Sequence, residues 1–187
     1  MTETTKRSRR TLLALLALFF APLAASFILY YGFNWRPAGG SNHGELLQPL
    51  RQLPVTAAPL LGQWALVYVG DGRCDEDCRR ALVFARQTRL SLNKDMSRVN
   101  WALMAVSQCC DREYLDREHS GMQLFDVSDA NQGDALRAVL PSAADTWRHY
   151  LFVIDPRGNI VMRYDVRESP RGLLDDMKKL LKLSHIG

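Results

Sequence analysis

Two cysteines, Cys74 and Cys78, are the residues of this 187-residue chain that are best suited to chemistry. Because three residues separate them, a helix would place them on one face or on either side of its first turn. At this spacing two thiols can close a disulfide, or two thiolates can bind one soft ion such as Cu(I). The pair therefore predicts redox or soft-metal chemistry, with a purely structural disulfide as the alternative.

The residues around the pair predict a strand before it and a helix after it. The stretch from Leu66 to Val69 is apolar, β-branched and aromatic, and Gly70-Asp71-Gly72 then breaks it. A helical spacing of apolar residues follows from Arg79 to Leu92. A buried strand that ends in a glycine turn and delivers a cysteine pair to a helix N-terminus is typical of thioredoxin-type sites.

Acidic residues fill the space between the two cysteines. The helix N-terminus favours the thiolate form of Cys74, which is the nearer of the two thiols to the helix start. Asp75, Glu76 and Asp77 oppose this effect, because neighbouring carboxylates disfavour a further negative charge. We therefore expect a pKa for Cys74 that is not strongly lowered, and a dithiol that is not a strong oxidant.

The N-terminal part of the chain predicts a single transmembrane helix. Basic residues in the segment 1–10 precede an uncharged run from Thr11 to Tyr31, which is about 30 Å long as a helix. Aromatic residues follow the run, as at a membrane interface. We expect a cytoplasmic tip at 1–10 and an anchor at 11–33. A signal peptide cleaved after Ala25 is the alternative.

The charge pattern places the bulk of the chain outside the cytoplasm. The positive-inside rule predicts a cytoplasmic N-terminus and a domain in a compartment that permits disulfides, which in a bacterial inner membrane is the periplasm. The formal net charge is +4, and four of the basic residues lie in the segment 1–10. The remainder is nearly neutral, so the composition predicts no nucleic-acid partner. Four cysteines are also too few for a disulfide scaffold.

The remaining pattern predicts a linker and lead-in at 34–62 and one α/β domain at 63–187. The fold class that we expect is a thioredoxin-like mixed β-sheet flanked by helices and preceded by one N-terminal transmembrane helix. Residues 107–120 are interpreted as a polar loop. The other expected elements are strands at 99–106, 122–126, 150–154 and 159–164, and helices at 135–140 and 173–183.

Three features of the chain resemble the SCO1/SenC family. They are the apolar anchor, the motif from Gly72 to Cys78, and the hairpin Phe152-Val-Ile-Asp-Pro-Arg-Gly158, and the lead-in from Asn42 to Pro49 is also similar. Members of that family are membrane-anchored thioredoxin-fold proteins that help to assemble the dinuclear copper site of cytochrome c oxidase. The resemblance implies Cu(I) as the bound ion and a cytochrome c oxidase subunit as the partner.

The resemblance also implies a histidine ligand for copper, but this sequence departs from the family pattern there. The family's histidine lies eight residues before the aspartate of the hairpin turn, where this chain has Trp147, and His149 lies two residues later. In an extended chain a shift of two residues keeps a side chain on the same face. His149 is therefore expected either to complete a metal site with Cys74 and Cys78, or only to pack there.

Two other functions remain open at this stage. The chain could be a general anchored thiol–disulfide oxidoreductase, with Cys74 as the nucleophile and Cys78 as the resolving thiol. It could also be a non-catalytic, thioredoxin-like interaction module with a structural disulfide.

The other cysteines and histidines have less defined roles. Cys109 and Cys110 are either resolving thiols or extra soft ligands, or loop cysteines that are free or modified, since adjacent cysteines rarely bridge each other. His43 is expected to be a solvated linker residue. His119 and His185 are expected to lie on the surface.

Overall fold

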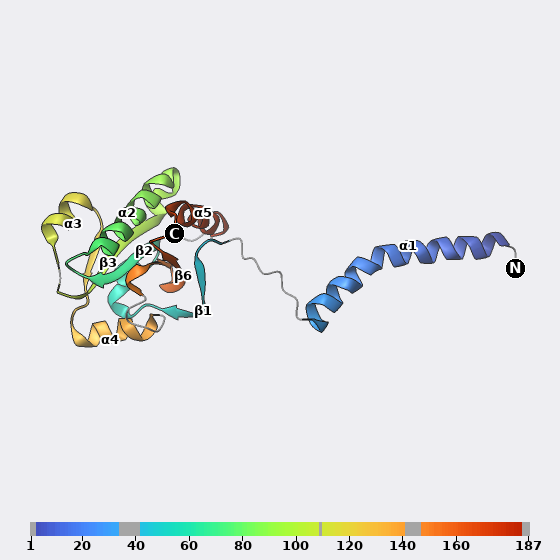
Figure 1. Ribbon diagram of the computed structural model, residues 1–187, viewed down its shortest axis with the longest axis horizontal. Coiled ribbons are helices and arrows are strands. Elements are labelled where there is room, and N and C mark those ends of the chain that lie inside the picture. The colour runs from blue at the N-terminus through green and yellow to red at the C-terminus, as the bar shows by residue number, and fades with distance from the viewer. Residues whose placement is uncertain (1–2, 34–41, 109, 141–146, 185–187) are drawn as a thin grey trace. The chain divides into compact units, whose positions relative to one another are not determined.

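Figure 1 shows the computed structural model of the chain, which describes residues 3–33, 42–108, 110–140 and 147–184. Three sequence-based predictions lie outside these residues: the linker at 34–41, Cys109 and the surface position of His185. The chain forms two compact units, Met1–Gly40 and Ser41–Gly187, and each is described by itself.

The first unit is a long apolar helix. Helix α1 spans Glu3–Phe27 and continues as a π-helical turn, Ile28–Gly32. Within it, Ser8–Gly32 covers 25 residues with a mean hydropathy of 2.6, so it is long and apolar enough to cross a membrane. Pro22 lies inside the helix, which membrane helices tolerate. An apolar N-terminal helix was expected and is confirmed; its length and composition also fit a signal sequence.

The second unit is built on one mixed sheet of six strands in the order β1-β6-β5-β2-β3-β4. Strands β2, β3 and β4 pair in parallel, whereas β5 pairs antiparallel to β2, and β6 and β1 extend that side as antiparallel strands. The strands are β1 Glu45–Gln52, β2 Trp64–Asp71, β3 Val99–Ser107, β4 Gln123–Asp126, β5 Tyr150–Ile154 and β6 Asn159–Asp165. The helices are α2 Glu76–Ser91, α3 Arg112–Glu118, α4 Ala130–Val139 and α5 Pro170–Leu183, with short 3₁₀ segments at Val55–Leu60, Asn93–Arg98 and Trp147–His149.

Two apolar cores cover the two faces of this sheet. On one face, β2 packs with α2 and α5 through side chains such as Tyr68, Leu82 and Met177. On the other face, it packs with α4 through side chains such as Val67 and Leu136. Figure 1 shows α2 and α5 on one side of the sheet and α4 on the other. Strand β2 is buried from Trp64 to Gly70 and is therefore a rigid support for whatever follows its carboxyl end.

Helices α3, α4 and α5 correct the sequence-based prediction. The segment 107–120 is not a plain loop, because α3 forms within it and Asp111 caps the helix by accepting the N–H of Tyr114. Helix α4 begins at Ala130 rather than at 135, and Gly133 inside it weakened the sequence signal. Helix α5 begins at Pro170 rather than at 173, because Ser169 is its N-cap.

His43 is exposed to solvent, as predicted, but it is not a free linker residue. Its side chain is 52% exposed, but its backbone N–H donates to Asp176, whose side chain is only 2% exposed, at 2.7 Å. Gly44 donates to the same carboxylate oxygen at 2.8 Å, and Nδ1 of His43 lies 3.3 Å from the other oxygen. The entry of the chain into the second unit is therefore fixed to α5.

Candidate redox site

The site begins where β2 ends and the chain turns. Gly72 donates its N–H to the carbonyl of Ser107 and accepts the N–H of Asp111, which ties the turn to the segment after β3. The N–H of Cys74 donates to the carbonyl of Asp71 at 3.1 Å. Cys74 has a φ of 53°, in the left-handed region that costs an L-residue about 1–2 kcal/mol. The hydrogen bonds around the turn hold Cys74 in this conformation.

Cys74 and Cys78 are joined by a disulfide, and their Cα atoms lie 4.9 Å apart. The two residues are not equivalent. Cys74 lies two positions before the first residue of α2, whereas Cys78 lies in the first turn and its N–H donates to the capping carboxylate of Asp75 at 3.0 Å. Each cysteine is only 1% exposed, so the disulfide belongs to the edge of the apolar core. An outside thiol can reach it only if the surrounding side chains move.

The three carboxylates between the cysteines are all engaged. Asp75 caps the helix, and Glu76 pairs with Arg80 at 3.0 Å. Oδ2 of Asp77 lies 2.7 Å from Nδ1 of His149. The negative charge that we expected to oppose a thiolate is thus partly offset by a helix N-terminus and by basic partners.

His149 is in contact with the acidic segment of the motif, but it is not placed as a third ligand here. His149 ends the 3₁₀ turn Trp147–His149. The two-residue shift assumed an extended chain before β5, and the chain is not extended there. Nδ1 of His149 and the Asp77 carboxylate are close enough for an ion pair but not aligned as a hydrogen bond. Among the described residues, no cluster of three His, Cys, Asp or Glu side chains could hold a metal ion. A copper role for Cys74, Cys78 and His149 therefore stays a proposal.

A charged cavity of about 660 Å³ lies beside the disulfide, and Cys74 but not Cys78 contributes to its wall. Its lining combines three arginines with three carboxylates around one sulfur-bearing residue: Asp71, Arg73, Cys74, Asp75, Glu76, Arg79 and Arg148. The backbone N–H of Arg73 donates to Asp71 and lowers the pKa of that carboxyl. The asymmetry indicates that a partner would meet Cys74 first.

Tyr68 contacts Arg148, which lines this cavity, and Tyr68 stays neutral. Its hydroxyl donates to the carbonyl of Arg148 at 2.9 Å. Burial, followed by the charges of Asp75 and Asp77, raises the pKa of this phenol far above its usual 10. Tyr68 therefore serves as a buried hydrogen-bond donor that connects β2 to the turn before β5.

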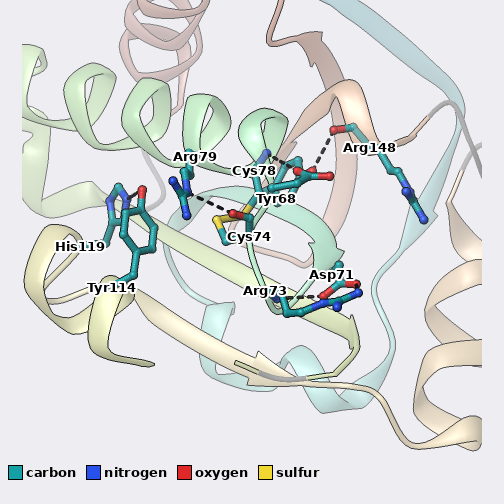
Figure 2. The surroundings of a disulfide bond; sticks show 10 residues. Tyr68, Asp71, Arg73, Cys74, Cys78, Arg79, Tyr114, His119 and Arg148 are labelled. Atoms are coloured by element: carbon teal, nitrogen blue, oxygen red, sulfur yellow. Dashed lines mark hydrogen bonds and ion pairs between the residues drawn. A yellow bond between two sulfur atoms is a disulfide. The ribbon is translucent and has the colours of Figure 1, made fainter. Parts of the chain in front are cut away.

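On the α3 side, His119 corrects the sequence-based prediction of a surface residue. It is 2% exposed and lies against the Trp101 ring, with a centroid distance of 5.5 Å. Its Nε2 lies 3.1 Å from the hydroxyl of Tyr114 (Figure 2). Burial, followed by the charge of Arg86, lowers the pKa of His119 below its usual 6.5. No apolar periodicity in the sequence could have revealed this burial, because α3 is short and mostly polar.

Cys110 is disulfide-bonded, so it is not a free loop thiol. It also packs against the core cluster that contains Cys74 and Cys78. A role for Cys110 as a resolving thiol stays a prediction from the sequence.

The comparisons with known proteins agree with this architecture. Residues 64–184 match a family model described as "Transmembrane-like, thioredoxin-like, C-terminal domain". No curated protein sequence matches the chain.

Solved structures of Sco proteins share the fold. Apo Sco1 from Thermus thermophilus has a TM-score of 0.58 at 14% identity, with 76% of this chain and 99% of that chain covered. Yeast Sco1 with copper bound has a TM-score of 0.55 at 16% identity, with 78% and 96% covered. Bradyrhizobium japonicum ScoI with copper bound has a TM-score of 0.50 at 17% identity, with 73% and 98% covered.

These comparisons confirm the predicted thioredoxin-like fold. They also confirm the predicted resemblance to SCO1/SenC proteins at the level of the fold. At these identities the likeness to the Sco structures concerns the fold alone. The family model, in contrast, spans most of the second unit, including the disulfide and the cavity beside it. The chain therefore belongs to the family of transmembrane-like, thioredoxin-like proteins that this C-terminal domain defines.

Proposed function

We propose that this protein is a membrane-anchored, Sco-like thiol–disulfide exchange protein that works through Cys74 and Cys78. The observation that carries the proposal is the placement of their disulfide. It lies where a buried strand meets a helix N-terminus, and Cys74 alone of the pair borders the charged cavity. A disulfide that only held distant segments together would not need a cavity beside one of its cysteines.

The chemistry follows from this asymmetry. In the reduced protein, the Cys74 thiolate attacks a client disulfide, forms a mixed disulfide and expels one client thiolate. The Cys78 thiolate then attacks the sulfur of Cys74 and expels the second client thiolate. Two electrons pass to the client, and the Cys74–Cys78 disulfide seen in the structure is the product. A dithiol donor restores the reduced pair.

The client that we propose is the copper-binding cysteine pair of a cytochrome c oxidase subunit. The support is the resemblance of the motif and the hairpin to the SCO1/SenC family, together with the Sco-like fold. In this proposal α1 holds the protein in a bacterial inner membrane, with the N-terminus in the cytoplasm and the redox domain in the periplasm.

Cu(I) carriage is the second candidate function, with copper as cargo rather than as a resident cofactor. It is favoured by the copper-bound structures of yeast Sco1 and B. japonicum ScoI. Cys74 and Cys78 would supply soft thiolate ligands once their disulfide is reduced, and His149 would have to turn from Asp77 toward them.

One experiment separates the two functions. The full chain in detergent is reduced and then given either Cu(I) with a competing chelator or an oxidised peptide that carries two cysteines. Exchange predicts stoichiometric reduction of the peptide, which is lost in Cys74→Ser and unaffected by His149→Ala. Copper carriage predicts 1:1 binding that is weakened in Cys74→Ser, Cys78→Ser and His149→Ala. A chain that does neither would contradict both proposals.

A further inference from the structure

Arg79 is the charged side chain that the structure brings to the backbone of Cys74. It lies in the first turn of α2, and its Nε donates to the carbonyl of Cys74 at 3.2 Å. It also lines the cavity that Cys74 borders. Figure 2 shows the Arg79 side chain between Cys74 and Tyr114. Its guanidinium is thus held beside the cysteine that the proposed function makes the nucleophile.

The charge of Arg79 is not neutralised by a carboxylate among the described residues, unlike that of its neighbours. Arg73 lies 3.5 Å from Asp71, and Arg80 lies 3.0 Å from Glu76. Arg79 instead contacts a carbonyl and an aromatic ring. A cation without an anionic partner can balance a new negative charge that forms next to it.

Tyr114 fixes the second side of Arg79. The guanidinium carbon lies 4.9 Å from the centroid of the Tyr114 ring, which is a cation–π distance. The Tyr114 hydroxyl contacts Nε2 of His119 at 3.1 Å, and buried His119 packs against Trp101 of β3. A continuous chain of contacts therefore runs from the central sheet through α3 to the guanidinium.

We propose that Arg79 stabilises the Cys74 thiolate of the reduced pair and that Tyr114 is a positioning residue that holds Arg79 there. This inference rests on the proposed exchange function. The charge interaction exists only when the pair is reduced, because a disulfide carries no charge. Arg79 therefore shifts the equilibrium toward the dithiol and makes the disulfide easier to reduce.

The test is the redox equilibrium of the full chain with glutathione. Two molecules of glutathione reduce the disulfide and become oxidised glutathione, so the fraction of dithiol at equilibrium reports the potential. The mixtures are quenched with acid and alkylated, and the modified cysteines are identified by mass spectrometry. We expect Arg79→Gln to shift the equilibrium about five-fold toward the disulfide, an estimate for one partly solvated charge pair.

Arg80→Gln is the matched control, because it removes the same charge from the next residue of the same helix. We expect it to change the equilibrium by less than about two-fold, since Arg80 pairs with exposed Glu76. Arg79→Lys keeps the charge but loses the planar group that rests on Tyr114, so it should fall between Arg79→Gln and the wild type. Equal shifts in Arg79→Gln and Arg80→Gln would overturn the role of Arg79.

The positioning role of Tyr114 is tested with two substitutions. Tyr114→Leu removes the ring and should shift the equilibrium in the same direction as Arg79→Gln. Tyr114→Phe keeps the ring and should shift it less. The double variant Arg79→Gln/Tyr114→Leu should match Arg79→Gln alone, because Tyr114 acts through Arg79. Full additivity of the two shifts would contradict this role.

The outcomes also separate this inference from the proposed function. If Cys74 and Cys78 exchange with glutathione but all variants share one equilibrium, only the inference fails. If the wild-type pair stays oxidised in every buffer while the protein remains folded, the proposed function fails and the inference fails with it. Circular dichroism of each variant checks the fold, and Arg79→Lys supplies the result if Arg79→Gln does not fold.

Discussion

The surroundings of Cys74 and Cys78 differ, and this difference supports the separate roles that we propose for them in exchange. Cys74 precedes α2, has a left-handed backbone and borders the charged cavity. Cys78 lies inside the first helical turn, and its backbone is fixed by Asp75. In the proposed exchange, Cys74, which borders the cavity, is the attacking residue, and Cys78, which lies in the helix, is the resolving one.

A trapping experiment tests these roles. Cys78→Ser leaves Cys74 without a resolving thiol, so incubation with oxidised glutathione should give a stable mixed disulfide at Cys74. Cys74→Ser should form several-fold less adduct at Cys78, because Cys78 does not line the cavity. Peptide mass spectrometry locates the added glutathione. Equal amounts of glutathione adduct in the two variants would contradict the separate roles proposed for Cys74 and Cys78.

At the residue scale, local spacing in the sequence predicted the cysteine pair but not the partners of its neighbours. The apolar strand and the glycine turn were enough to place Cys74 and Cys78 at a strand–helix junction. His149 was expected near the pair, but its contact with Asp77 could not be foreseen, because the contact joins residues that meet only through the pairing of β2 with β5. The burial of His119 was missed for a similar reason.

Helix α3 is the element that most changes the description of the site. It lies in a segment that the sequence predicts to be a loop, and its residue Tyr114 packs against the guanidinium of Arg79. Its residues are mostly polar and number only seven, so they show no helical apolar pattern over two turns. The strands were easier to predict, because β2, β3 and β5 are continuous apolar runs, as expected for strands buried on both faces.

His119 makes the stability of this element depend on pH. Burial lowers the pKa of His119 in the folded state below its unfolded value near 6.5, so the unfolded chain binds more protons as the pH falls. The resulting stability is complete above pH 6.5 and is lost as the pH falls through the folded pKa. Urea unfolding at pH 7.5 and 5.0 should show a smaller loss in His119→Phe than in the wild type.

The control is the same comparison of unfolding free energies at pH 7.5 and 5.0 in His43→Phe, because the side chain of His43 is half exposed rather than buried. An equal loss of unfolding free energy in the wild type and in His119→Phe would contradict the role given to His119.

Helix α5 fixes the entry of the chain through one buried carboxylate. Asp176 accepts the backbone N–H groups of His43 and Gly44. Asp176→Ala should lower the free energy of unfolding by about 2–3 kcal/mol, because it leaves two donors without their acceptor. Asp175→Ala, one residue away and making neither of these contacts, should change the free energy of unfolding by less than about 1 kcal/mol. Chemical denaturation of both variants checks this, and equal losses would contradict the assignment.

At the scale of the whole molecule, the sequence predicted two parts of different chemistry, an apolar helix and an α/β domain. The uncharged run was long enough to indicate a membrane span, and Ser8–Gly32 fits that prediction by length and composition. The order of strands in the sheet could not be obtained from the sequence alone. It depends on non-local pairings such as β1 with β6, which pairs Glu45 with Arg163.

Membrane attachment is tested by extraction. Alkaline carbonate should leave the full chain in the membrane pellet, because the 25-residue apolar helix is long enough to cross a hydrocarbon core that is about 30 Å thick. A chain that begins at residue 37 behind a cleavable secretion signal should appear in the soluble fraction. A reporter fused after residue 187 that is active only in the periplasm reports the orientation. Carbonate release of the full chain would contradict an uncleaved anchor.

The reversible redox reaction of Cys74 and Cys78 is the central claim, and one titration tests it most directly. The full chain in detergent is equilibrated with dithiothreitol and glutathione buffers that span the range of known protein dithiols, and the thiols are counted after alkylation. We predict a two-electron transition in the peptides that contain Cys74 and Cys78, counted separately from the disulfide of Cys110, with a potential above about −300 mV and a fold that survives reduction. A pair that stays oxidised below that potential, or that unfolds the domain when reduced, would identify a structural disulfide and contradict the account.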